Sequence, residues 1–99
     1  MKELPKLQHG ELFPLGRVVA TPAVLRAIEK SGESPIAYLT RHHHGDWGDL
    51  TDDDKQANIE AVADGTRILS AYHLIDRTKI WIITEADRSM TTILLPEDY

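Results

Sequence analysis

Two stretches of the chain carry most of the side chains that could bind a ligand or take part in a reaction. The first, Arg41–Leu50 (RHHHGDWGDL), places ionisable groups and an indole around two glycines, where a flexible backbone lets side chains approach a ligand closely. The second, Lys79–Pro96 (KIWIITEADRSMTTILLP), interleaves polar and apolar residues as a β-hairpin does. We therefore expect a functional site in or beside these stretches.

The run His42-His43-His44, followed by Asp46, has the residue types of a metal site. Adjacent residues on a helix diverge by about 100°, whereas the protein ligands of one ion usually recur at spacings such as i, i+4. The chain has no cysteine, which also excludes thiolate sites and disulfides. We therefore predict a polar helix end, with no metal site and no cofactor.

Metal-independent cleavage of RNA is the enzymatic alternative. It needs an acid, a base and phosphate-binding cations that converge within hydrogen-bond reach. The sequence has no Gly-rich phosphate loop, nucleophile elbow or helical His-Glu-x-x-His pattern. Whether the chain is an enzyme therefore stays open, with a compact, toxin-like endoribonuclease as the alternative. The side chains that could serve are His42, Arg67, Tyr72, Lys79, Thr84 and Arg88.

Binding through aromatic anchors is the non-enzymatic hypothesis, because aromatic residues dominate the energetics of interface centres. Our candidate binding residues are Asp46, Trp47, Tyr72, Trp81 and Arg88. Asp46 and Trp47 have two interpretations: a turn in which the aspartate bonds local amides while the indole covers the core, or a loop that projects toward a partner. We expect Tyr72 and Trp81 to be neighbours on one sheet face, with Trp47 close enough for one partner to touch all three.

These side chains must be positioned by helices in the first two thirds of the chain. Thr21, Ser34 and Thr51 are each placed to cap a helix, the first two being followed by proline at the first helical position. Three carboxylates follow Thr51 where the helix dipole favours negative charge. Residues 15–20 are short and β-branched, and we expect them to add a strand to the sheet.

From Thr66 onward the apolar period is two, which predicts antiparallel strands over 67–74, 79–85 and 90–95. With two-residue turns, Tyr72 would stand opposite Trp81, and Trp81 opposite Leu94. The more aliphatic face, centred on Ile80, Ile82 and Ile93, should meet the helices. The expected fold is α+β: three helices followed by a three-stranded antiparallel β-meander, extended by the N-terminal strand.

Length and charge restrict the class of protein. With 99 residues, we expect a flexible arm over 1–11 and a single α+β domain over 12–99. The 11 Lys and Arg residues against 16 Asp and Glu give a net charge of −5, which disfavours nonspecific binding to nucleic acid. No apolar run is long enough to cross a bilayer and no secretory signal is visible, so we expect a cytoplasmic protein.

Four segments carry a resemblance that covers nearly the whole chain after the arm. Phe13–Pro22, Arg41-His42 with Gly45–Gly48, Arg67 through Tyr72 and Lys79–Ser89 resemble a family of small uncharacterised bacterial proteins encoded on plasmids, prophages and other mobile elements. The resemblance implies a genetic setting. Within it, we expect a noncatalytic accessory protein that binds a protein partner, with antagonism of a host defence system as one version. A homodimer is compatible with these features.

Overall fold

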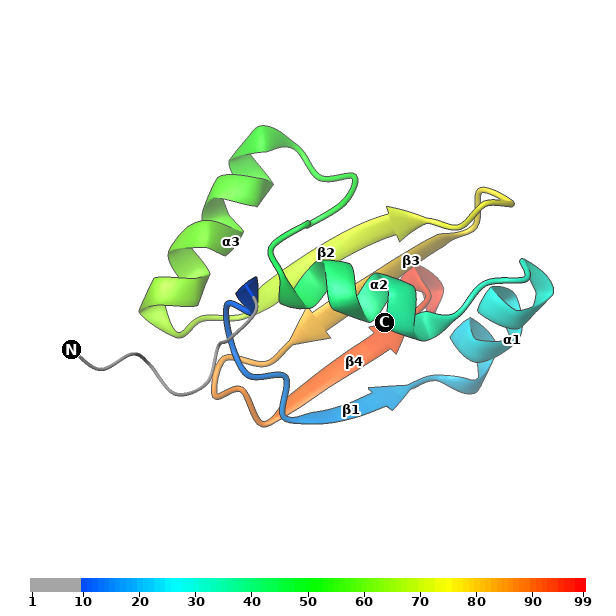
Figure 1. Ribbon diagram of the computed structural model, residues 1–99, viewed down its shortest axis with the longest axis horizontal. Coiled ribbons are helices and arrows are strands. Elements are labelled where there is room, and N and C mark those ends of the chain that lie inside the picture. Colours follow the sequence, from blue (N-terminus) through cyan, green and yellow to red (C-terminus); the bar gives the residue numbers. More distant parts are fainter. Residues whose placement is uncertain (1–9) are drawn as a thin grey trace.

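The computed structural model describes residues 10–99 (Figure 1). The arm expected over residues 1–11 therefore lies outside the described residues, except for residues 10 and 11. The elements, in chain order, are β1 (Arg17–Ala20), α1 (Pro22–Lys30), α2 (Pro35–His43), α3 (Asp52–Asp64), β2 (Ile68–His73), β3 (Lys79–Thr84), β4 (Met90–Leu94) and the 3₁₀ turn η2 (Pro96–Asp98). The α+β class is confirmed.

Each helix begins where its local sequence predicts. The Thr21 hydroxyl accepts a hydrogen bond from the third residue of α1 at 3.2 Å, and the Thr51 hydroxyl does the same for α3 at 3.1 Å. Ser34 caps α2 by accepting from Ile36 at 3.3 Å. Helix α3 ends at Gly65, whose φ of 74° lies in the left-handed region that glycine adopts without strain. These contacts are local in sequence, which is why the helix starts were predictable.

The sheet differs from the expected meander. Its four strands are ordered β1-β4-β3-β2, and β1 pairs in parallel with β4 while the other pairs are antiparallel (Figure 1). The meander of β2, β3 and β4 is present, and the strand expected over 15–20 is added to it as β1, which pairs in parallel with β4. A strand entering from the N-terminus can pair only with an edge that is free, and the far edge of β2 is covered.

Two segments cover that far edge. The Ala71 N–H donates to the carbonyl of Trp47 at 3.1 Å, and the Asp49 N–H donates to the Ala71 carbonyl at 2.6 Å. Two residues earlier in β2, the Asn58 side chain bonds both the carbonyl and the N–H of Leu69, at 2.7 and 3.1 Å. Because the backbone groups of an exposed strand edge invite pairing with another chain, this cover removes one such edge and ties α3 to β2.

The register between β3 and β4 is the expected one, and that between β2 and β3 is not. Trp81 stands opposite Leu94 as predicted, but Tyr72 stands opposite Ile80 rather than Trp81. Since successive side chains in a strand point to opposite faces, a slip of one residue turns the whole of β2 over. Tyr72 and Trp81 therefore lie on opposite faces of the sheet.

The cause is the turn between β2 and β3. It is a three-residue connection, residues 75–77, closed by a hydrogen bond of 2.8 Å from the Leu74 N–H to the Thr78 carbonyl. Its last residue, Arg77, has a φ of 80°, as in a hairpin loop that ends on a left-handed residue. An odd number of loop residues shifts the pairing by one relative to the two-residue turn that we expected.

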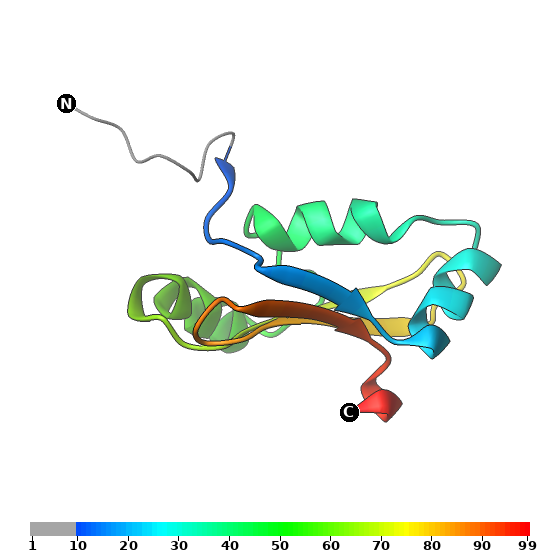
Figure 2. The ribbon, with the colours of Figure 1, turned by 90° about the horizontal axis from the view of Figure 1, so that it is seen from below.

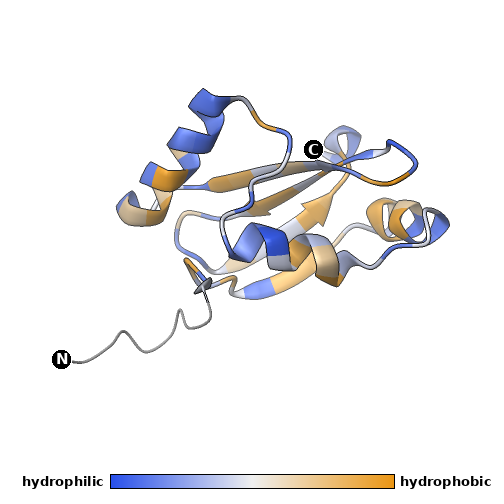
Figure 3. Cartoon of the chain, turned by 45° about the horizontal axis from the view of Figure 1, so that its top comes forward, coloured by the Kyte–Doolittle hydropathy of each residue, from blue (hydrophilic) through white to orange (hydrophobic). Residues whose placement is uncertain are grey.

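Helix α2 lies on one face of the sheet and η2 on the other (Figure 2). Helix α1 lies at the ends of the strands, and its Val24 and Ile28 pack into the core on the α2 side. The helix side holds the larger core cluster, in which Ile80, Ile82 and Ile93 are at most 2% exposed, so the aliphatic face was predicted correctly. In Figure 3 the strands carry hydrophobic colours, whereas α3 is mostly hydrophilic. The rest of this cluster is Val24, Ile28, Tyr38, Tyr72 and Leu74.

Candidate functional site

Trp81 lies on the sheet face opposite α1 and α2, because it alternates along β3 with the helix-facing Ile80 and Ile82. We call this the open face. A cavity of about 230 Å³ is found there, and half-buried Trp81 is one of its walls. The lining residues are Arg67, Leu69, Trp81, Ile83 and Tyr99.

Two aromatic rings and a guanidinium shape this cavity. The Trp81 and Tyr99 ring centroids are 5.9 Å apart, with planes inclined at 72° in an edge-to-face arrangement. Arg67 donates from Nη1 to the Tyr99 hydroxyl at 2.7 Å, and its Cζ lies 5.4 Å from the Tyr99 ring centroid. Its Nε is 3.7 Å from Oε1 of Glu85. The hydrogen bond to Tyr99 raises the pKa of Arg67 above its ordinary value, so the guanidinium stays charged.

The chain end that carries Tyr99 is held in place by Asp98. Its Oδ2 accepts hydrogen bonds from the Thr21 hydroxyl at 2.7 Å and from the Leu95 N–H at 3.1 Å. Thr21 is also the N-cap of α1, so one residue fixes both the helix start and the turn η2. These hydrogen bonds of Asp98 keep Tyr99 beside Trp81, although the Tyr99 side chain is exposed.

The cavity has the chemistry of a binding site. Its walls offer apolar and aromatic surface, one positive charge and a phenol, and none of the five lining residues is a histidine, serine or threonine that could form a nucleophile-base pair. Planar or apolar groups, and anionic groups near Arg67, fit this set. Of the five predicted binding residues, only Trp81 lines it.

Two other predicted residues, Trp47 and Tyr72, belong to the core. Trp47 is 4% exposed and stacks on Phe13 with centroids 6.2 Å apart. Tyr72 is 1% exposed, and its hydroxyl donates to the Asp46 carbonyl at 2.7 Å. The expected surface shared by Trp47, Tyr72 and Trp81 is therefore not formed. The β2 register turns Tyr72 inward, and the bridge between Gly48 and Ala71 draws the Trp47 loop against β2.

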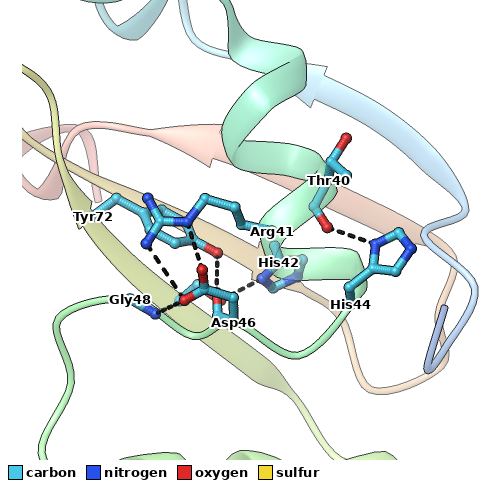
Figure 4. A network of polar contacts seen from close by, with 8 residues as sticks. Thr40, Arg41, His42, His44, Asp46, Gly48 and Tyr72 are labelled. Atoms are coloured by element: carbon cyan, nitrogen blue, oxygen red, sulfur yellow. Dashed lines mark hydrogen bonds and ion pairs between the residues drawn. The ribbon is translucent and has the colours of Figure 1, made fainter. Parts of the chain in front are cut away.

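Asp46 forms the local turn that was one of its two interpretations. Its carboxylate accepts from Arg41 Nε at 2.7 Å and from the Gly48 N–H at 3.2 Å (Figure 4). The hydrogen bond from Arg41 is the main cause that lowers the pKa of Asp46. The Arg41 guanidinium also lies 4.6 Å from the Tyr72 ring centroid. This exposed cluster therefore covers Tyr72 and fixes the turn that follows α2.

Arg88 is placed at the C-terminal end of α3. Its guanidinium donates to the carbonyls of Thr66 and Ala61 at 2.6 and 2.8 Å, and its Cζ lies 5.8 Å from the Phe13 ring centroid. The Ala61 carbonyl already accepts from the Gly65 N–H at 2.9 Å, so Arg88 adds a further donor to it. A cation at this end of the helix also interacts favourably with the helix dipole. Arg88 acts here as a helix cap and is not part of the cavity lining.

A buried polar chain crosses the helix side of the sheet. Nδ1 and Nε2 of His42 lie 2.6 Å from Ser70 Oγ and 2.9 Å from Thr84 Oγ1. Thr84 is then 2.7 Å from Thr91 Oγ1, which donates to the Leu15 carbonyl at 2.7 Å. All four side chains are fully buried. Sequence reasoning missed this chain because its members are 7 to 76 residues apart.

The terminal carbonyl sets the direction of the hydrogen bonds between Leu15 and His42. Thr91 donates its proton to the Leu15 carbonyl, so Thr84 donates to Thr91 and accepts from His42 Nε2–H. Burial lowers the pKa of His42 from 6.5 to about 3, so the imidazole is neutral at physiological pH. With its one proton on Nε2, the neutral ring accepts from the Ser70 hydroxyl at Nδ1.

The groups suggested for RNA cleavage do not meet at a surface. His42 and Thr84 are in contact but fully buried, and Arg67 lies at the cavity on the other face. Among residues 10–99, no group of three or more His, Cys, Asp or Glu side chains could hold a metal ion. In the same residues no helix is long and apolar enough to cross a membrane.

Sequence reasoning named Trp81 but missed Tyr99 as its partner, since nothing in the local pattern marks Tyr99. Arg67 was noted only as a cation for phosphate.

No family model, curated protein or solved structure matches this chain.

Proposed function

We propose that this chain is a noncatalytic binding module that holds a protein partner on the open face of its sheet. The cavity beside Trp81 carries the proposal. Arg, Trp and Tyr are the residue types enriched among the side chains that dominate binding energy in protein interfaces, and Arg67, Trp81 and Tyr99 stand together around one cavity. Aliphatic Leu69 and Ile83 complete its lining and can exclude water from a group seated there.

The chemistry of the rest of the molecule supports binding over catalysis. His42, the best general base in the enzymatic alternative, has no exposed surface, and its pKa of about 3 keeps it neutral at physiological pH. A general acid or base must reach the reacting group and have a pKa near the working pH, and His42 meets neither condition.

The setting that we propose comes from the family resemblance: an accessory protein of a mobile element, working in the cytoplasm on a protein of its host or of the element itself. Antagonism of a host defence system is one version of this role. A chain without cysteine is compatible with this reducing compartment.

The experiment is affinity purification of the tagged full chain from its native host, with Tyr99→Ala as the test variant. Tyr99 is 69% exposed, so its truncation should leave the fold intact while removing one wall of the cavity. The matched control is Ile36→Ala, which removes an apolar side chain that is 64% exposed on α2. We expect the partner captured by the wild type to be retained by the control and lost by Tyr99→Ala.

Two results would contradict the proposal. One is capture of the same partner, in the same yield, by Tyr99→Ala and by a folded Trp81→Ala variant. The other is RNA cleavage by the purified chain together with growth arrest on overexpression, which would favour the endoribonuclease.

A further inference from the structure

Cations and carboxylates both lie on the open face. Alternation along β1 and β3 places Arg17 and Lys79 on this face with Trp81, and Arg67 stands at the cavity. The carboxylate of Glu85 stands beside Arg67, and η2 brings Glu97 and Asp98 to the same face. The Asp98 carboxylate is bonded to Thr21 and Leu95. Among these charged groups, Arg67 is the one that lines the cavity.

The size of the cavity restricts what can occupy it. At about 230 Å³ it is smaller than the usual range of about 300–1,000 Å³ for small-molecule sites. Its walls are the edge-to-face rings of Trp81 and Tyr99 and the aliphatic side chains of Leu69 and Ile83. One aromatic side chain suits both this volume and these walls.

Arg67 can bind an anionic group beside the aromatic ring that fills the cavity. A guanidinium has five N–H donors, and its bond to the Tyr99 hydroxyl uses one. Glu85 at 3.7 Å is beyond hydrogen-bond distance, and both side chains are more than 40% exposed. A carboxylate arriving from outside can therefore bind the fork of Arg67 with better geometry than Glu85 does.

We infer that the cavity takes an aromatic side chain whose neighbouring residue is acidic, presented by a protein partner. The inference rests on the proposed function and states the chemistry of its ligand. A nucleobase could also stack on these rings, and adenosine monophosphate is the probe for that alternative.

The test uses blocked dipeptides titrated into the full chain and followed by amide NMR. The probes are N-acetyl-Phe-Glu-amide, N-acetyl-Phe-Lys-amide, N-acetyl-Gly-Glu-amide and adenosine monophosphate. We expect Phe-Glu to bind about three- to tenfold more tightly than Phe-Lys, as one partly exposed charged hydrogen bond allows. Gly-Glu should bind more weakly still, and the shifted resonances should be those of the cavity lining.

Variants separate charge from packing. Arg67→Gln should abolish the preference for Phe-Glu over Phe-Lys while the ring still binds, and Glu85→Gln should strengthen Phe-Glu binding because it removes a competing carboxylate. Arg26→Gln, which removes an exposed cation on α1, is the matched control and should change nothing. If Arg67→Gln does not fold, the wild type must still lose its preference at high salt, since salt screens exposed charges.

Equal affinity for Phe-Glu and Phe-Lys would overturn the inference, as would tighter binding of adenosine monophosphate or shifts confined to another surface. The two proposals fail separately. Loss of the captured partner on Tyr99→Ala without a preference among the probes refutes only the ligand chemistry. A clear preference with undiminished partner capture refutes only the proposed partner site.

Discussion

Acidification from about pH 7 to about pH 5 should destabilise the protein mainly through His42. In the folded state its pKa is about 3, against 6.5 when it is unperturbed, because burial penalises the charged imidazolium. Between these two pH values, His42 binds a proton in the unfolded chain and does not bind it in the folded chain. Stability is therefore fully present above pH 6.5 and is lost as the pH falls toward 3.

The magnitude follows from the two pKa values. At pH 5 most unfolded molecules carry the His42 proton and almost no folded ones do, which lowers the free energy of unfolding by about 2 kcal/mol. This is a large share of the stability of a domain of this size. Carboxylates whose pKa is lowered by local hydrogen bonds, such as Asp46 and Asp49, add losses of the same sign, but mainly below about pH 5.

Urea denaturation at a series of pH values measures this effect. The free energy of unfolding should be constant above about pH 7.5 and fall by about 2 kcal/mol on the way to pH 5. In His42→Gln, which keeps a donor and an acceptor but cannot titrate, the fall should vanish even if the variant is less stable. NMR of the wild-type imidazole should show the Nε2–H form persisting at pH 5. A flat profile in the wild type, or a protonated His42 at pH 5, would refute the reasoning.

Three further predictions concern packing, backbone and metal. Replacing Ile82 by Ala should cost about 2–4 kcal/mol in chemical denaturation, because its side chain is fully buried; a loss well under 1 kcal/mol would mean that the site collapses without a cavity. Gly48→Ala should prevent or severely impair folding, because its φ is 77° and a Cβ would lie 2.0 Å from the Ala71 carbonyl oxygen. The control is Gly32→Ala, because Gly32 has a φ of 76° but a Cβ built there has no atom within 4 Å. This substitution should cost only about 1–2 kcal/mol in melting experiments. Equal losses of stability at Gly48 and Gly32 would contradict the steric argument. Stoichiometric zinc should leave the melting temperature unchanged, since residues 42–44 end a helix and form no metal cluster with other described residues; tight one-to-one binding by calorimetry would contradict this.

The features that could be predicted from the sequence depend on residues close together in the chain. A helix cap such as Thr21 and its target amide are three residues apart, so the pattern alone contains the interaction. Alternation along β3 likewise separates Trp81 from Ile80 and Ile82 without any knowledge of neighbouring strands. The register between β3 and β4 was predictable because the four residues 86–89, between Glu85 and Met90, whose N–H and carbonyl are bonded at 3.0 Å, keep the same pairing as the expected two-residue turn.

The rest was decided by contacts that no local pattern contains. Arg77 takes a left-handed φ that its residue type does not signal, and this one residue turns Tyr72 from the open face into the core. The site depends on contacts between residues far apart in the sequence. The hydrogen bond that holds Tyr99 beside Trp81 joins Thr21 to Asp98, which are 77 residues apart. Sequence by itself determined the elements and the face of Trp81, since those follow from local geometry. Only the tertiary structure decided what stands next to that indole, because the free energy that places Tyr99 and Arg67 there comes from pairings that exist once the chain has folded.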